Sequence, residues 1–222
     1  MTVAIVVPVK SPRKAKHRLS PLLSEIERFQ LAGAMARDVF RTLAGLEEYP
    51  RLVVSDDADI LAEAVQNRLE TLQDRIGQGQ SAAVQQGFAA IWGQGYTSGL
   101  TIPGDVPAVT ANELREFAEY RPEIEVLLVS DRERVGTNGL RLVPPHAITL
   151  RFGEDSFNLH RAEASRVNRS FAVHDVVGLQ CDLDQPADVA AFLRLERETE
   201  TLNLLRQLKV PERVLAGSQR RA

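Results

Sequence analysis

The sequence has a single cysteine, Cys181, among its 222 residues. One thiol excludes an internal disulfide, and no cysteine and histidine residues have the spacing of a zinc ligand set. We therefore expect no metal–thiolate site, and this cysteine usage favours a reducing, cytoplasmic environment. Cys181 itself is expected to be a small buried hydrophobic residue and not a nucleophile.

The sequence also lacks a long apolar run and an excess of positive charge. Residues 3–9 are apolar, but the run is too short for a membrane span or a signal peptide, and no basic segment precedes it. With 27 Lys and Arg against 30 Asp and Glu, the net charge is −3, which gives no general attraction to nucleic acid or to an anionic membrane. We expect neither as a partner, so an anionic ligand must be held by a local cluster of bases.

Two glycine-rich nucleotide-binding motifs are absent as well. The chain contains neither the Gly-x-x-x-x-Gly-Lys of a P-loop nor the Gly-x-Gly-x-x-Gly of a dinucleotide site. The absence of both motifs disfavours a P-loop nucleotide-binding protein and a dinucleotide-binding protein.

What the sequence does contain is an alternation of strand and helix patterns. Residues 3–9 and 51–56 are continuous β-branched runs, typical of strands that are buried on both faces of a parallel sheet. Between them, apolar residues recur every three or four positions over 24–46, and Ser24 with Glu27 forms a capping-box pattern. Further helices are expected at about 58–68, at about 80–92 and after Thr110, and further strands at 99–104 and 123–131.

After Asp131 the predicted elements become shorter. We expect strands at 140–145, 170–176 and 179–184, a helix at 157–167 and a final helix after Pro186. The length and the alternation predict an α/β fold: a single three-layer, Rossmann-like domain over residues 1–208 with a mixed, mostly parallel sheet. Residues 209–222 have little apolar content and are expected to be a frayed tail or to pack on a neighbouring surface.

Acidic residues follow two of the expected strands, at the edge where such a sheet binds its ligand. Asp105 follows a buried strand, and the preceding Gly104 allows close approach of the backbone. Asp182 and Asp184 alternate along a strand end, so both carboxylates point to one side. Three converging carboxylates with no softer ligand nearby predict a Mg²⁺ site. The structural alternative is that Asp182 or Asp184 caps the following helix and that Asp105 hydrogen-bonds its own turn.

The loop after the first strand concentrates positive charge in an otherwise slightly acidic chain. Its bases are Lys10, Arg13, Lys14, Lys16 and Arg18. In α/β proteins this loop meets the phosphates of a nucleotide, and Lys or Arg there would neutralise a triphosphate as pyrophosphate leaves. We expect Lys10, Arg13 and Lys16 to bind the nucleotide, and Lys16 and Arg18 to act in catalysis. A solvated surface loop is the alternative.

A third candidate site combines hydroxyls, an amide and a glycine. Its members are Thr137, Asn138, Gly153 and Ser156. The last two stand just ahead of an expected helix, where backbone N–H groups and a hydroxyl can bind an anion such as a small phosphorylated acid. The alternative makes Asp155 or Ser156 an ordinary helix N-cap. His160 could face the same site, although a lone histidine in a helix is more often a packing residue.

Five segments, taken in order, resemble the phospholactate/phosphoenolpyruvate guanylyltransferase family of coenzyme F-420 biosynthesis. They are PVKSPRKAKHRLSP, IPGDVPAVT, SDRERVGTNGL, RFGEDSFNLH and GLQCDLDQPADV, within residues 3–192. The resemblance implies a nucleotidyltransferase fold like that of the nucleotide-diphospho-sugar transferases, and the use of GTP and Mg²⁺. It also implies transfer of GMP to a phosphorylated three-carbon acid with release of pyrophosphate.

Matching motif positions carries the roles of family residues onto this chain. The resemblance implies a metal site at Asp105, Asp182 and Asp184, an acceptor site at Thr137, Gly139, Gly153 and Ser156, a nucleotide-bordering segment with Gly79 and Ser81, and a catalytic role for Asp105. The acceptor stays open among 2-phospholactate, phosphoenolpyruvate and 3-phosphoglycerate. Another sugar or cofactor nucleotidyltransferase and a non-catalytic nucleotide-binding regulator are the alternatives, and the late helices offer a face for a homodimer.

Overall fold

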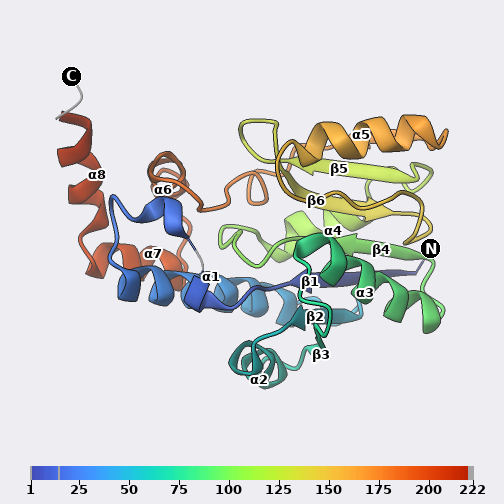
Figure 1. Ribbon diagram of the computed structural model, residues 1–222, viewed down its shortest axis with the longest axis horizontal. Coiled ribbons are helices and arrows are strands. Elements are labelled where there is room, and N and C mark those ends of the chain that lie inside the picture. The colour runs from blue at the N-terminus through green and yellow to red at the C-terminus, as the bar shows by residue number, and fades with distance from the viewer. Residues whose placement is uncertain (1, 15, 220–222) are drawn as a thin grey trace.

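A seven-stranded sheet forms the centre of the fold, in the order β3-β2-β1-β4-β6-β5-β7 (Figure 1). The computed structural model describes residues 2–14 and 16–219. The strands are β1 Val3–Pro8, β2 Arg51–Ser55, β3 Glu70–Gln73, β4 Ser98–Thr101, β5 Val126–Ser130, β6 Thr137–Leu142 and β7 Phe171–Val173. β6 is antiparallel to both of its neighbours, and the other pairings are parallel. The predicted mixed, mostly parallel sheet is therefore confirmed.

Helices cover both faces of this sheet and extend beyond it. They are α1 Glu25–Ala44, α2 Ala58–Gln66, α3 Gln80–Gly93, α4 Ala111–Glu119, α5 Ser156–Arg166, α6 Pro186–Leu193, α7 Glu200–Gln207 and α8 Val210–Gln219. Two short 3₁₀ helices, η1 Pro12–Lys14 and η2 His17–Leu19, lie in the loop after β1. The capping box predicted at Ser24 forms, and Thr110 makes another with Glu113, which explains why α1 and α4 begin where they do.

Two hydrophobic cores lie on opposite faces of the sheet. Under one face, α1 and α4 contribute Phe40, Leu43 and Phe117, all fully buried. On the other face, α3 and α5 contribute Phe88 and Phe157. The central strands are buried on both sides, which is why they appear in the sequence as continuous apolar runs.

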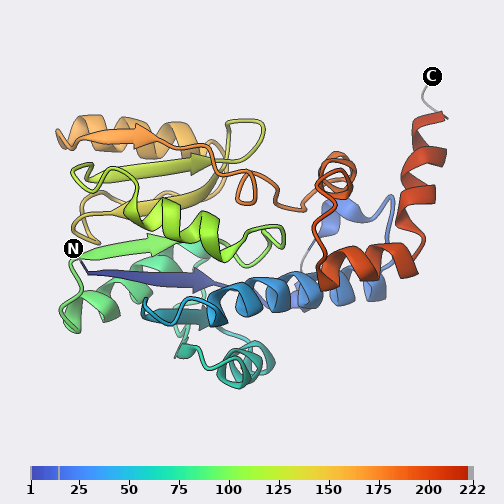
Figure 2. The same cartoon turned by 180° about the vertical axis from the view of Figure 1, so that it is seen from behind.

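A third core lies outside the sheet and defines the helical extension, which consists of η2, the first half of α1, and α6 to α8. Its buried residues include Leu19, Leu31, Met35, Phe192 and Leu205. Figure 2 shows α1 running from below β1 out to α7, with α8 rising at the far end. The extension therefore has a core of its own while sharing one helix with the sheet.

The last helix lies in the segment for which the sequence suggested a tail. α8 begins at Val210, which is fully buried in the third core. Arg213 donates to the carbonyl of Leu22 and to both carboxylate oxygens of Glu27 at the start of α1. Residues 220–222 of the tail lie outside the described residues. No helix in the described part of the chain is both long and apolar enough to cross a membrane.

Three details differ from the sequence-based expectations. Residues 179–184 form no strand, so that prediction is wrong, although Cys181 and Leu183 are buried as the alternation requires. β3 was not anticipated, because it is a short, partly exposed edge strand with polar residues. β6 begins at Thr137, before the predicted 140–145, and so includes residues that the sequence placed in a loop.

Candidate active site

The largest group of predicted site residues lines one cleft, at the carboxyl ends of the adjacent strands β1 and β4. This cavity has a volume of about 440 Å³ and is lined in part by Lys10, Lys16, Gly79, Gly104, Asp105 and Asp184. The strand order reverses direction at this pair, since the chain moves outward from β1 to β3 and then returns to β4 on the other side. That is where an open α/β sheet binds its ligand. Gly104 is required here, because an added Cβ would lie 2.8 Å from Val9.

Lys16 joins two of the predicted acidic residues. Its Nζ lies 2.5 Å from Asp105 Oδ2 and 2.5 Å from Asp184 Oδ1, and only 6% of its side chain is exposed. The residue has a left-handed backbone conformation with φ 61°, which turns the chain between η1 and η2. Asp105 and Asp184, which lie 89 and 168 positions after Lys16 in the sequence, are thus held around its ammonium group.

Asp182 is held by Asn138 and interacts with this pair through its charge. A β-bulge lies where Val129 pairs with Gly139 and Ser130 with Thr137, which leaves Asn138 as the extra residue. Bulges of this kind redirect a side chain at the edge of a site. The Asn138 amide donates to Asp182 Oδ1 at 2.8 Å and to the Leu179 carbonyl at 2.9 Å. The sequence placed Asn138 at the acceptor, whereas the structure makes it the partner of an acidic residue.

The three carboxylates influence one another electrostatically. Burial raises the pKa of Asp182 to about 7, the negative charges of Asp105 and Asp184 add to the effect, and the Asn138 hydrogen bond opposes it. Burial would raise the pKa of Asp184 too, but the charge and hydrogen bond of Lys16 hold it below its usual value, with Arg18 and Lys10 contributing. Burial likewise opposes the charged form of Lys16, yet Asp105 and Asp184 raise its pKa. The three carboxylates therefore repel one another, and the Lys16 ammonium stabilises the ionised forms of Asp105 and Asp184.

The structural alternatives for these acidic residues are not observed. The N-cap of α6 is Gln185, and the carboxylate that caps the helix belongs to Asp188, which accepts from the amides of Asp184 and Gln185. Neither Asp182 nor Asp184 caps that helix. Asp105 bonds to Lys16 across the cleft.

The segment between β3 and α3 forms another wall of the cleft. Gly79 has φ 89° at the N-cap of α3, and Gly77 has φ 63°. Both values lie in the region that favours glycine. Asp74 fixes the turn, because its Oδ1 accepts from the amides of Ile76 and Gly77. Ser81 does not line the cleft; its hydroxyl accepts from the amide of Phe152 at 2.8 Å and joins this segment to the predicted acceptor loop.

Three of the predicted acceptor-binding residues meet at the start of α5. The Thr137 amide donates to Ser156 Oγ at 2.9 Å, and the Ser156 amide donates to the Gly153 carbonyl at 3.2 Å. Gly153 has φ 125°, and a Cβ there would meet no atom within 4 Å. Asp155 occupies the N-cap position without a side-chain cap, so its carboxylate does not saturate the helix N-terminus. The third predicted site thus combines the start of β6, the start of α5 and the loop that precedes α5.

Gly139, Arg13 and Arg18 are placed apart from these groups. Gly139 faces the core, since an added Cβ would lie 3.0 to 3.1 Å from Phe117, Val129 and Leu179. Arg18 is exposed and acts on the site through its charge on Asp184.

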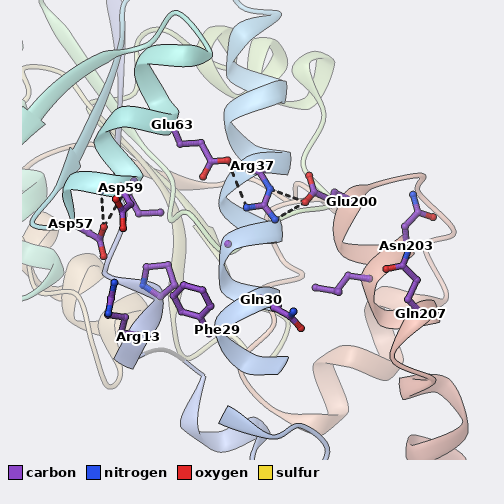
Figure 3. Close-up of a pocket in the computed structure, with 14 residues that line it drawn as sticks. Arg13, Phe29, Gln30, Arg37, Asp57, Asp59, Glu63, Glu200, Asn203 and Gln207 are labelled. Atoms are coloured by element: carbon purple, nitrogen blue, oxygen red, sulfur yellow. Dashed lines mark hydrogen bonds and ion pairs between the residues drawn. The ribbon is translucent and has the colours of Figure 1, made fainter. Parts of the chain in front are cut away.

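Arg13 lines a second cavity, of about 500 Å³, between η1, α1, α2 and α7. Figure 3 shows Arg13 below Asp57, with Phe29 beside it and Arg37 held by Glu200 across the cavity. The placement of Arg13 gives its predicted role in nucleotide binding no support.

The carboxylates of Asp105, Asp182 and Asp184 are the candidate ligands of a metal ion. Across residues 2–14 and 16–219, no group of three His, Cys, Asp or Glu side chains is arranged to hold a metal ion. Asp105 and Asp184 nevertheless share a cation, the Lys16 ammonium, and the charges of both raise the pKa of Asp182. Two carboxylates with a third nearby match the oxygen donors that Mg²⁺ takes from a protein. The residues present therefore fit such an ion chemically.

The fold defines the class of protein. A protein from Desulfovibrio desulfuricans G20 that carries the provisional name nucleotide-diphospho-sugar transferase superimposes with a TM-score of 0.79 at 16% identity, over 97% of this chain and 98% of its own. A nucleotidyl transferase from Methanothermobacter thermautotrophicus gives a TM-score of 0.62 at 14% identity, over 86% and 95% of the two chains. The chain has the fold of the nucleotidyltransferases, as predicted.

The sequence then identifies the family. Residues 3–222 match the family described as guanylyl transferase CofC like, and this chain belongs to it. The phosphoenolpyruvate guanylyltransferase of Rubrobacter xylanophilus is 35% identical over 191 residues, 86% of this chain and 93% of the relative. The 2-phospho-L-lactate guanylyltransferase of Methanobrevibacter smithii is 29% identical over 216 residues, 97% and 94% of the two chains. The resemblance stated from the five segments is confirmed, and the chain is a nucleotidyltransferase.

Proposed function

We propose that this enzyme joins GMP from GTP to a small phosphorylated three-carbon acid and releases pyrophosphate, as a step of coenzyme F-420 biosynthesis. The observation that carries the proposal is the Lys16 ammonium held between Asp105 and Asp184, in a cleft at the ends of β1 and β4. The names of the relatives, which act on 2-phospho-L-lactate or phosphoenolpyruvate, support the acceptor class.

The chemistry is a direct displacement. An oxygen of the acceptor phosphate attacks the α-phosphorus of GTP, a new P–O bond forms, and the bond to the bridging oxygen breaks so that pyrophosphate leaves with that oxygen. Both reactants are anions, and each pair of unit charges at 4 Å costs about 1 kcal/mol in water and several times more in a drier cleft. The bases of the first loop, Lys10 and Lys16 in the cleft with Arg18 nearby, offset this repulsion.

Asp105, Asp184 and Asp182 would hold Mg²⁺. A bound Mg²⁺ supplies positive charge for the phosphate oxygens and a template for in-line geometry. Asn138 contributes by fixing the orientation of Asp182. Lys16 lines the same cleft as Lys10, where its ammonium would also face the phosphates of the nucleotide.

The acceptor binds at the start of α5. Gly153 leaves open space for close approach of an anion beside the start of α5. The amides of Ser156 and Phe157 there donate to the carbonyls of Gly153 and Val135, so hydroxyl groups supply the donors. Thr137 and Ser156 add hydroxyl donors. Gly79, in the cleft wall, borders the nucleotide in this arrangement.

One assay tests this function. Purified protein is incubated with Mg²⁺ and each of the four common nucleoside triphosphates. The acceptor is 2-phospho-L-lactate, phosphoenolpyruvate, 3-phospho-D-glycerate or a sugar 1-phosphate, and pyrophosphate is measured. Release with GTP and one of these acids is the expected result. Release with a sugar phosphate and not with the acids selects the alternative transferase, and no release with any acceptor contradicts the proposal. Cytoplasmic location and a homodimer stay predictions.

A further inference from the structure

The acceptor side of the site contains a buried histidine whose two ring nitrogens are both hydrogen-bonded. His160 lies in α5 and is fully buried. The backbone amide of Arg151 donates to its Nε2 at 2.9 Å, and its Nδ1 lies 3.0 Å from Thr137 Oγ1. The Phe152 ring packs edge-on against the imidazole, with centroids 4.9 Å apart. The ring is therefore held in place on three sides.

These contacts fix the tautomer of the ring. A backbone amide can only donate, so Nε2 accepts and carries no proton. Burial lowers the pKa of His160 to about 4, so the ring is neutral at pH 7 and its single proton is on Nδ1. Nδ1 accordingly donates to the hydroxyl oxygen of Thr137.

The direction of this hydrogen bond determines what Thr137 can offer to a ligand. Its oxygen accepts from His160, so its own proton points elsewhere and is free to be donated. Ser156 is in the same condition, because its oxygen accepts from the amide of Thr137 at 2.9 Å. Two hydroxyls beside the glycine loop are thus set as donors. The carboxylate and phosphate groups of a phosphorylated acid are mostly ionised near pH 7, so these groups present mainly hydrogen-bond acceptors.

We propose that His160 is a positioning residue that sets the Thr137 hydroxyl as a hydrogen-bond donor toward the phosphorylated acid. It does not touch the acid or the reacting phosphorus. The inference rests on the proposed function for its substrate. In this arrangement the proton on Nδ1 of the neutral His160 ring makes Thr137 a donor, and a donor favours an anionic ligand.

Two substitutions of His160 separate its two hydrogen bonds. In His160→Gln, the amide oxygen takes the place of Nε2 and accepts from Arg151, but nothing replaces the Nδ1 donor. In His160→Asn, the shorter amide places an N–H near Nδ1 and keeps the bond to Thr137. We expect His160→Gln to raise the KM for the acid roughly tenfold, the loss of about one hydrogen bond to a charged group, with the KM for GTP unchanged. His160→Asn should stay within roughly threefold of the wild type.

A double-mutant cycle shows whether His160 acts through Thr137. Thr137→Val removes the hydroxyl and should raise the KM for the acid as much as His160→Gln does. The double variant Thr137→Val/His160→Gln should be no worse than Thr137→Val alone, because the two changes remove one shared interaction. Additive effects would overturn the inference. So would equal increases in KM for both substrates in His160→Gln and His160→Asn, the pattern of a general packing role.

A spectroscopic measurement tests the inference without turnover. Nitrogen-15 NMR of histidine-labelled protein should show one of the four histidines as a neutral ring protonated at Nδ1 from pH 6 to pH 8, and its signal should be missing in His160→Gln. Protonation at Nε2, or a charged ring at pH 7, would overturn the inference even if the variants fold poorly. Failure of the wild type to release pyrophosphate with any acid would instead contradict the proposed function and leave the NMR result to stand.

Discussion

The two halves of the sheet contribute opposite kinds of chemistry to the site. The parallel half, β3-β2-β1-β4, ends in charged groups, and Lys16 and Asp105 follow β1 and β4. The strands β6 and β5 of the mixed half, with α5, present neutral donors, Thr137 and Ser156, supported by a neutral His160. The loop after β7 then returns to the charged group, to which it adds Asp182 and Asp184. Under the proposed function, the charged groups lie where bonds break, and the neutral donors lie where the acceptor binds. The predictions below test this division, beginning with the largest effect.

Asp105→Asn tests the charged half most directly. The variant keeps the shape of the side chain but removes one carboxylate charge beside Lys16. We expect turnover to fall roughly 1,000-fold, the scale of losing a main electrostatic group at a reacting centre, with the melting temperature little changed. Pyrophosphate release and a thermal melt measure the two effects. Asp59→Asn, at an exposed residue of the second cavity, is the matched control. Wild-type turnover in Asp105→Asn would show that this carboxylate has no part in the reaction.

The neutral half should become less stable in acid because of His160. Its folded pKa of about 4 lies below the model-peptide value of 6.5, so the unfolded state binds the proton first as the pH falls. Its contribution to stability is complete above about pH 6.5 and is lost as the pH drops toward 4. From pH 7 to pH 5 the loss is about 2 kcal/mol. Urea unfolding of the wild type and His160→Gln at both pH values measures it; an identical pH dependence would show that the buried ring titrates normally.

Asn138→Ala tests a residue that belongs to both groups, because Asn138 lies in β6 of the mixed half but holds the carboxylate of Asp182. Losing the amide removes the group that orients Asp182. We expect the Mg²⁺ concentration needed for half-maximal turnover to rise roughly tenfold, as for other groups that orient a ligand of a metal. A Mg²⁺ titration of pyrophosphate release gives the value. If the KM for the acid rises instead, Asn138 belongs with the neutral donors, as the sequence first suggested.

Ser156→Ala should produce a smaller effect that is confined to the acceptor. It removes one hydroxyl donor and leaves the Thr137 amide without its partner. One neutral hydrogen bond contributes about 1 kcal/mol, so the KM for the acid should rise roughly fivefold. The KM for GTP serves as the internal control, and a matching rise there would place Ser156 in a structural role.

The smallest effect is expected far from both halves. Arg213→Ala breaks the ion pair between α8 and Glu27, whose pKa is lowered to about 2 chiefly by the hydrogen bond from Arg213. Pairs at the surface contribute less than about 1 kcal/mol. Urea unfolding should detect a small loss, and turnover should not change. Arg206→Ala, which breaks a 3.4 Å contact with Glu198, is the control; a large loss of turnover in Arg213→Ala would tie α8 to the site.

The parallel half was the more predictable one. Buried parallel strands appear as β-branched runs, and their carboxyl ends meet at one edge. Asp105 and two of the bases after β1, Lys10 and Lys16, accordingly line the same cleft. Arg13 follows the same strand yet turns to another cavity, because the path of a loop is set by contacts distant in sequence. Because Arg13 and Lys16 are close in the sequence, the sequence alone could not predict that they face different cavities.

The mixed half was less predictable because its geometry depends on strand pairing. The bulge that redirects Asn138 arises from the register of β5 against β6, and a side-chain pattern along one strand carries no information about its partner's register. The segment 179–184 shows the converse case. Its alternation predicted a strand and was wrong about pairing, but correct about which side chains are buried.

Helix α1 determines how the two ends of the molecule can move. Twenty residues make a rod about 30 Å long, with Phe40 buried under the sheet and Leu31 in the extension. Near its middle, Asp38 accepts from the amides of Glu200 and Thr201 and so fastens α7 to it. A rod anchored in both cores has no joint at which one body could swing against the other. We therefore expect the cleft at the ends of β1 and β4 to keep its width, so that only side chains and loops at its rim adjust to a ligand.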